Sequence, residues 1–282
     1  MSTHVDHAFA TPEPIDLYVE NGRGSVVVTA SDTTETTVRI TGPRAEEYDV
    51  RHLVDGPGRA RVAILAPHRN GGIFGKDSRT EIVVGVPVAS GLEAKVGSSD
   101  VAAHGRLGDT RVDSGSGDVS LDVVDGETAV KSGSGDVTAE LLAGSGLVKT
   151  GSGDVVVRRA DSSLLVTTGS GDVRIEASGD ELAIKTGSGD AEVRAMAGEA
   201  VFTTGSGDLV IGDAAAGRIT AKTASGDVRI GVRPGLPVWT DVRTASGRLS
   251  SDLPSTGEPA PGQPYLEVRA TTASGDVTLH QN

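Results

Sequence analysis

The sequence predicts an all-β protein, a single-stranded parallel β-solenoid built from 18-residue coils with about two strands each. Three observations predict this fold. The tripeptide Ser-Gly-Asp recurs at a fixed step, apolar and polar residues alternate after each copy, and the 282 residues include 39 glycines but only three Phe, three Tyr and one Trp. A fixed internal period is typical of repeat architectures. Identical stacked turns favour glycine at one backbone position, and a thin core has room for aliphatic side chains rather than rings.

The repeat is strict in the middle of the chain and loosens toward its end. Asp100 stands one full period before a run of six aspartates that recur at the same fixed step. The later members of the series, Asp227, Arg248 and Asp276, follow at progressively longer steps. We attribute the longer steps to loop insertions at residues 233–237 and 254–264. The six regular aspartates are Asp118, Asp136, Asp154, Asp172, Asp190 and Asp208.

Each repeat contains two short stretches with the period-two alternation of a half-buried strand. The first stretch follows the aspartate directly, with apolar residues one and three positions on, as at Val155 and Val157. The second stretch occupies offsets ten to fourteen. One coil cannot bury its own apolar face, so stacking is needed to form a continuous core. The inward positions predicted for the second stretch are Val130, Val148, Val166, Ile184 and Phe202, and the outward ones are Lys131, Lys149, Thr167, Lys185 and Thr203.

We predict a single domain, residues 12–282, with three sections. Residues 12–95 alternate less regularly and are expected to form early coils that cap the stack. Residues 96–231 form the regular coils, and residues 232–282 form coils with loop insertions and the C-terminal edge. The last strand, Val277 to Leu279, is expected to be that edge, where the polar ending His280-Gln281-Asn282 would block the addition of another strand.

Composition argues against several functional classes. The absence of cysteine excludes disulfides, zinc–thiolate sites, iron–sulfur clusters and thiol nucleophiles. The formal net charge of −13 argues against nucleic acid as a partner, and the shortage of aromatic residues argues against base stacking. No apolar run is long enough to insert into a membrane. The N-terminus lacks the features of a secretory signal, so we expect a cytoplasmic protein, with the cell surface as the alternative.

Stacking would place the aspartates of the repeated turn Thr-Gly-Ser-Gly-Asp-Val in one column. Carboxylates about 4.8 Å apart repel each other by roughly 1 kcal/mol per pair in water. Hydrogen bonds from backbone N–H groups, as in Asx turns, would offset this repulsion. Alternatively, the six regular aspartates are candidate ligands for a row of calcium ions, because calcium-binding β-rolls use a nine-residue repeat. The aspartate directly follows glycine and occupies one half of each coil, which does not match β-roll geometry, so we expect no cofactor.

The Ser-Gly-Asp-Val turns, the strand spacing and the closing segment from Leu266 to Val277 resemble the bacterial β-strand-repeat domains labelled "putative adhesin", a family of unknown function. The likeness covers nearly the whole chain. The form without a leader resembles members from high-GC Gram-positive bacteria. The resemblance implies a β-repeat architecture and brings no catalytic residues.

We therefore expect a non-enzymatic, adhesin-like binding or scaffold protein that presents a rigid acidic surface to a protein or polymer. The candidate contact residues are Phe74, in a glycine-rich loop, and the outward Lys131, Lys149 and Lys185. The alternatives are a filament that self-associates through exposed coil ends, and the divalent-cation β-roll. An enzyme acting on a polysaccharide is a remote alternative, because the aspartates are spaced for symmetry and not as one acid and one base.

Overall fold

The computed structural model describes residues 3–54, 59–67, 79–254, 259–260 and 262–282. They divide into two compact units, residues 1–145 and 146–282. Apart from the short 3-10 helix η1 (Ala45–Glu47), the regular elements of the described residues are all β-strands. The all-β class is therefore confirmed.

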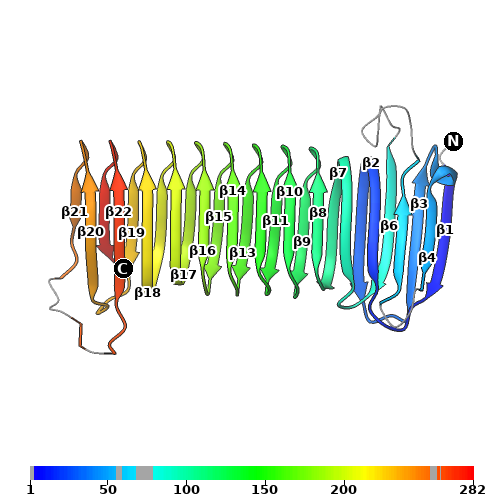
Figure 1. Ribbon diagram of the computed structural model, residues 1–282, viewed down its shortest axis with the longest axis horizontal. Coiled ribbons are helices and arrows are strands. Elements are labelled where there is room, and N and C mark those ends of the chain that lie inside the picture. Colours follow the sequence, from blue (N-terminus) through cyan, green and yellow to red (C-terminus); the bar gives the residue numbers. More distant parts are fainter. Residues whose placement is uncertain (1–2, 55–58, 68–78, 255–258, 261) are drawn as a thin grey trace. The chain divides into compact units, whose positions relative to one another are not determined.

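Unit 1 contains strands paired in parallel and, nearer its N-terminus, strands paired antiparallel. Strands β7 to β11 pair in parallel, and β10 lies beside β8 with Val130 opposite Val112, a shift of one repeat. Long strands β2 and β7 each bend through most of a coil (Figure 1). The strands are β1 (Thr3–Ala10), β2 (Asp16–Ser31), β3 (Glu35–Gly42), β4 (Asp49–Leu53), β5 (Arg61–Leu65), β6 (Thr80–Pro87), β7 (Gly91–Leu107), β8 (Thr110–Ser114), β9 (Val119–Val124), β10 (Thr128–Ser132) and β11 (Val137–Leu142).

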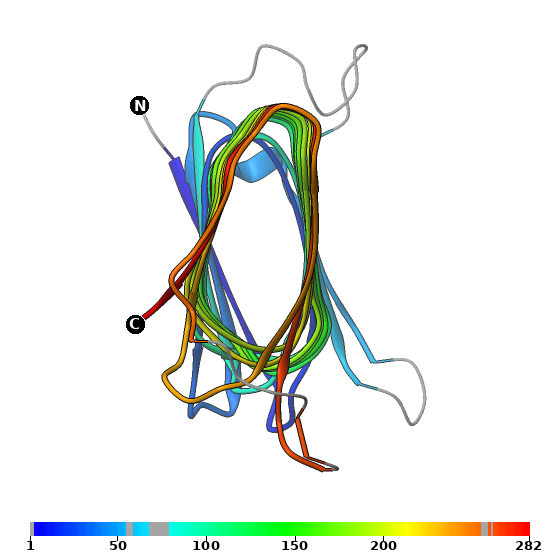
Figure 2. The same ribbon diagram turned by 90° about the vertical axis from the view of Figure 1, so that its left-hand side faces the viewer.

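Unit 2 consists of parallel strands. From β12 to β17, residues one repeat apart in the sequence lie opposite each other in neighbouring strands, as Val148, Val166 and Ile184 do. The period predicted from the sequence therefore sets the strand register. Figure 2 looks along the stack and shows the strands of each coil on two opposite sides. The strands are β12 (Gly146–Thr150), β13 (Val155–Ala160), β14 (Leu164–Thr168), β15 (Val173–Ser178), β16 (Leu182–Thr186), β17 (Ala191–Thr204), β18 (Leu209–Thr223), β19 (Val228–Val232), β20 (Val238–Thr244), β21 (Leu249–Ser251), β22 (Leu266–Thr272) and β23 (Val277–Gln281).

The core of each unit consists of columns of small aliphatic residues. The predicted inward positions of the second strand, Val130 in unit 1 and Val148, Val166, Ile184 and Phe202 in unit 2, are all buried. Each such residue lies at the same place in its coil, so its side chain packs against its equivalent in the next coil.

The sheet is mixed, and parallel pairing does not extend through the whole of residues 12–95. Strand β3 is antiparallel to β1 and β6, and β4 is antiparallel to β5. The chain also doubles back here, because β2 pairs with β5 and β6 on one side and with β7 on the other. The antiparallel strands β3 and β4 pair with the outer edges of β6 and β5, which would otherwise present unpaired backbone groups.

The expectation that Val277 to Leu279 form the C-terminal edge is wrong. Strand β22 lies between β18 and β20, and β23 lies between β19 and β21. The chain therefore skips one position after β19, builds the outermost coil of β20 and β21, and returns to fill the gap. Burial explains this order: Val268 and Val277 are fully buried, whereas Leu249 in the outer coil is 49% exposed.

Candidate functional site

The repeated turn is held by one threonine and one glycine. The Thr186 hydroxyl accepts a hydrogen bond of 2.8 Å from the Gly189 N–H. A Cβ atom on Gly189 would lie 1.9 Å from the Gly171 carbonyl oxygen of the neighbouring coil, so this position requires glycine. Within unit 2 the same bond is made by Thr150, Thr168, Thr204, Thr223, Thr244 and Thr272.

The aspartates form a ladder that joins neighbouring coils. The Asp190 N–H donates to Oδ1 of Asp172 at 3.0 Å, and Oδ1 of Asp190 accepts from the Asp208 N–H at 2.8 Å. The ladder follows the spatial order of the coils, since Asp276 donates to Asp227 and Arg248 then donates to Asp276. In unit 1 the same bonds join Asp100, Asp118 and Asp136. In unit 2 they also join Asp154 to Asp172 and Asp208 to Asp227.

These bonds support the hydrogen-bond explanation of the aspartate column. Charge-assisted bonds to N–H groups offset part of the repulsion between neighbouring carboxylates. They differ from Asx turns in that the donor belongs to the next coil. Among the described residues, no group of three or more His, Asp or Glu side chains is arranged to hold a metal ion. Calcium binding at the six regular aspartates stays an untested alternative to the predicted absence of a cofactor.

A row of cations runs across the outward face of the second strands in unit 2. We call this set the lysine row. Because neighbouring parallel strands are about 4.8 Å apart, cations at every second strand are about 10 Å apart. In register order the row comprises Lys149, Thr167, Lys185, Thr203, Lys222, Thr271 and Arg243.

The lysine row borders a row of apolar side chains on the same face. Leu147, Leu165, Ala183 and Val201 lie two residues before the lysine-row positions of β12 to β17 and are partly or fully exposed. From β18 onward the second row continues with Thr220, Arg269 and Asp241. Among the described residues of the two rows the one acid is Asp241, which pairs with Arg243 at 3.3 Å. No ion pair joins Lys149, Lys185 or Lys222 to another residue that the structure describes.

The opposite face of unit 2 has a different charge pattern. Its cations are arginines with acidic neighbours: Arg174 lies 3.7 Å from Glu192, and Arg194 lies 3.2 Å from Glu176. Arg229 similarly lies 2.9 Å from Asp227. Cations without acidic partners are therefore concentrated on the lysine-row face.

Unit 1 carries lysines at the same position of the repeat, but acids separate them. Across β2, β7, β8 and β10 the order is Glu20, Lys95, Asp113 and Lys131. Lys95 lies 3.1 Å from Glu93, and its Nζ is 5.2 Å from the centre of the Tyr18 ring. Burial and the hydrogen bond to Glu20 raise the pKa of Tyr18. This face of unit 1 is thus mixed in charge.

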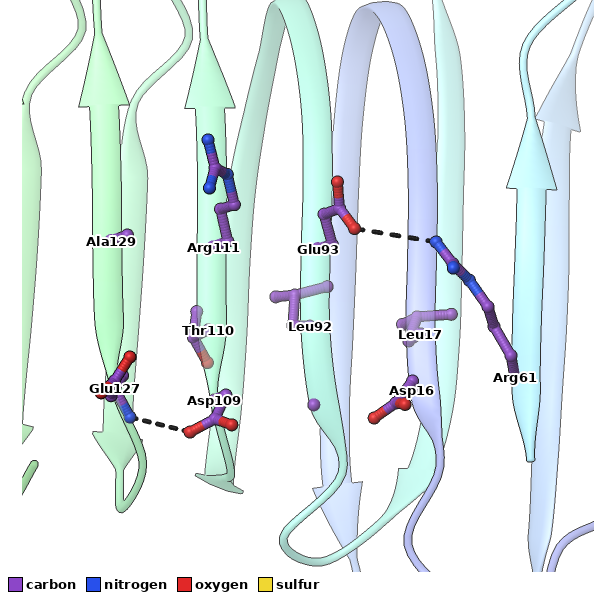
Figure 3. Close-up of a pocket in the computed structure, with 11 residues that line it drawn as sticks. Asp16, Leu17, Arg61, Leu92, Glu93, Asp109, Thr110, Arg111, Glu127 and Ala129 are labelled. Atoms are coloured by element: carbon purple, nitrogen blue, oxygen red, sulfur yellow. Dashed lines mark hydrogen bonds and ion pairs between the residues drawn. The ribbon is translucent and has the colours of Figure 1, made fainter. Parts of the chain in front are cut away.

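A shallow groove of about 340 Å³ lies on the same face of unit 1. Figure 3 shows Arg61 directed toward Glu93, at 3.7 Å, and the Glu127 N–H bonded to Asp109 at 2.9 Å. Arg61 and Glu93 pair within the groove, and Asp16 and Arg111 pair with Arg59 and Asp113 beside it, so the groove does not single out a ligand.

The contact residues predicted from the sequence fall in three places. Phe74 lies outside the described residues. Lys131 is in unit 1, and Lys149 and Lys185 share the lysine row of unit 2. Sequence reasoning missed Lys222 and Arg243. Both directly precede the threonine of a turn, as Lys149 and Lys185 do, and that position would have identified them.

The family model described as Toastrack DUF4097 matches residues 14–179 and 125–280. The chain belongs to the Toastrack DUF4097 family. The predicted resemblance to bacterial "putative adhesin" repeat domains is thereby confirmed. No match was found among curated proteins.

Solved structures similar to this Toastrack DUF4097 chain have low sequence identity. A "putative cell adhesion protein" from Clostridium sporogenes is 12% identical, with a TM-score of 0.31 over 99% of this chain and 100% of that one. A "putative adhesin" from Bacteroides fragilis is 14% identical, with a TM-score of 0.36 over 98% and 97%. A "putative lipid binding protein" from Parabacteroides distasonis is 13% identical, with a TM-score of 0.40 over 98% and 96%. These likenesses carry no functional argument. Within the described ranges, no helix of the chain is long and apolar enough to cross a membrane.

Proposed function

We propose that this Toastrack DUF4097 member is a β-solenoid that binds a linear acidic polysaccharide along the lysine row of unit 2, without transforming it. One observation carries the proposal. Lys149, Lys185 and Lys222 stand at every second strand of one face with no acidic partner among the described residues, whereas Arg174, Arg194 and Arg229 of the opposite face are ion-paired.

The spacing favours an extended partner. Lysine presents a compact ammonium group with three donors on a flexible stem, so a row of lysines suits anionic groups that vary in orientation. Several weak contacts about 10 Å apart gain strength when one chain makes them together. The net charge of −13 does not prevent this, because at physiological salt the field of distant carboxylates is screened beyond about 8 Å.

The rest of the face favours a sugar polymer over other polyanions. Thr167, Thr203 and Thr271 place hydroxyl groups between the cations, and the neighbouring apolar row offers Leu147 and Leu165 to the C–H faces of sugar rings. Single-stranded nucleic acid is bound by stacking its bases on aromatic side chains, and the described part of this face offers only Trp239 and Tyr265, both at its outermost strands.

The arrangement of the ladder aspartates does not suit acid–base catalysis, which supports a binding function for the protein. General acid–base work requires carboxyl groups whose environments separate their pKa values. Asp172, Asp190 and Asp208 instead repeat one arrangement, in which each accepts a hydrogen bond from a backbone N–H of the next coil.

Binding to dextran sulfate, with neutral dextran as the reference polymer, tests the proposal. We expect affinity that falls with added salt and weakens at least tenfold in Lys149→Gln/Lys185→Gln/Lys222→Gln, because three exposed contacts of about 0.5–1 kcal/mol are lost. The matched control is Arg174→Gln/Arg194→Gln/Arg229→Gln, which removes the same charge from the opposite face. Equal weakening by both variants, or tighter binding of single-stranded DNA of equal length, would contradict the proposal.

A further inference from the structure

Strands β20 and β21 form the end coil of unit 2 (Figure 1). Among the described residues, β20 pairs only with β22, and β21 only with β23. The inward Leu249 is 49% exposed and Val242 is partly exposed, whereas their neighbours Val277 and Ala270 in the adjoining coil are fully buried. Solenoid ends of this kind require a cover, so this coil is a candidate interface.

The outer coil does not continue the stack in the manner of the inner coils. Each inner coil offers an aspartate Oδ1 to the next coil, but the residue at that position here is Arg248, whose N–H already bonds to Asp276. Arginine has no acceptor, so the ladder ends. An added coil in the same direction would lack the bond that joins the others, which disfavours a filament formed by head-to-tail stacking.

The outward residues of β20 are self-complementary. Asp241 and Arg243 flank Val242 on this edge strand. If two β20 strands pair antiparallel about Val242, Asp241 of each copy lies opposite Arg243 of the other, and Thr240 lies opposite Thr244. Residues directly opposite in antiparallel strands have Cβ atoms about 4.5–5.5 Å apart, close enough for both ion pairs.

We propose that two copies of this chain join head to head through the β20–β21 coil, with antiparallel pairing centred on Val242. A two-fold axis through Val242 also brings β21 toward β21 and covers Leu249 in both copies. The interface is isologous and closes after two copies. It shares Arg243 with the lysine row but rests on the unpaired edge of β20, and it stands whether or not the polysaccharide is bound.

Sedimentation over a range of concentrations tests the dimer. We expect a species of twice the 28.6 kDa chain mass. Asp241→Arg places an arginine opposite Arg243 at both of these positions in the dimer. The resulting repulsion should raise the dissociation constant at least tenfold. The double variant Asp241→Arg/Arg243→Asp exchanges the charges, keeps the complementarity and should restore the dimer. Glu192→Arg, with the same charge change on another face of unit 2, should leave the dimer intact.

The single tryptophan provides a second measurement. Trp239 lies on the edge strand, is 48% exposed and has the Arg269 guanidinium 5.7 Å from its ring centre. Its emission should shift to shorter wavelength with concentration in the parent chain and the double variant but not in Asp241→Arg. Circular dichroism verifies the fold of each variant. A monomer at every concentration, assemblies larger than two, or a dimer that Asp241→Arg leaves unchanged would overturn the proposal.

Discussion

At the scale of the residue, the repeated turn assigns a separate task to each position. Threonine accepts the N–H of the following glycine, glycine allows the coils to approach, and aspartate links to the next coil, as in Thr186, Gly189 and Asp190. Spacing alone predicted the aspartate column and the buried aliphatic positions, because both repeat with the coil. It could not predict that the donor to each carboxylate lies in the next coil, because that depends on the registration of two backbones.

Substitutions of Asp190 test the ladder. Asp190→Asn keeps an Oδ1 acceptor and removes one charge from the column, so the thermal midpoint should stay equal or rise. Asp190→Ala leaves the Asp208 N–H without its 2.8 Å acceptor and should lower the free energy of unfolding by about 1 kcal/mol. Urea unfolding of both variants measures the difference. Equal losses in the two variants would mean that charge, and not the hydrogen bond, matters at this position.

At the scale of the element, both units contain a coil inserted out of chain order. The longer steps to Asp227, Arg248 and Asp276 could not reveal this, because coils of similar cross-section fit any position in a stack. Side-chain character carries the signal: the inserted strand β22 supplies Leu266, Val268 and Ala270 to the core, whereas β20 has Thr240 opposite Val268. Ion pairs also hold β22: the exposed Arg218 and Arg269 donate hydrogen bonds to the buried Glu267, and these bonds lower the pKa of Glu267.

Matched valine truncations test the inserted order. Val268→Ala removes methyl groups from a fully buried site and should lower the free energy of unfolding by about 2 kcal/mol. Val242→Ala, in the outer coil, should cost less than about 1 kcal/mol in the monomer, because the site is partly exposed. Urea denaturation at a concentration below dimer formation separates the two. A larger loss at Val242 would place β20, and not β22, inside the stack.

At the scale of the whole molecule, charge is unevenly distributed along an acidic chain. The composition of the sequence excluded thiol chemistry. The net charge gave no sign of a cationic row, because a total does not show where the individual charges lie. The row emerges only when the strand register places Lys149, Lys185 and Lys222 on one face.

Salt should stabilise the protein, because it screens the repulsion among the acidic groups of a chain with a net charge of −13 and along the aspartate ladder. We expect the thermal midpoint to rise between 0.01 and 0.2 M sodium chloride, as the screening length falls from about 30 Å to below 10 Å. Calcium chloride at equal ionic strength should add nothing further, since Oδ1 of each of these aspartates already accepts a backbone N–H group. An additional rise that a chelator reverses would instead establish the calcium alternative.

The inserted coil also has a consequence for biosynthesis. As the chain leaves the ribosome, residues 238–251 emerge before the strands that they pair with, because β22 and β23 comprise residues 266–281. The outer coil must wait, unpaired, until residues 266–281 have been made, and these later residues are then placed between two earlier segments. A ribosome that terminates before residue 266 would therefore release a chain in which an interior coil is missing while the outer coil is present.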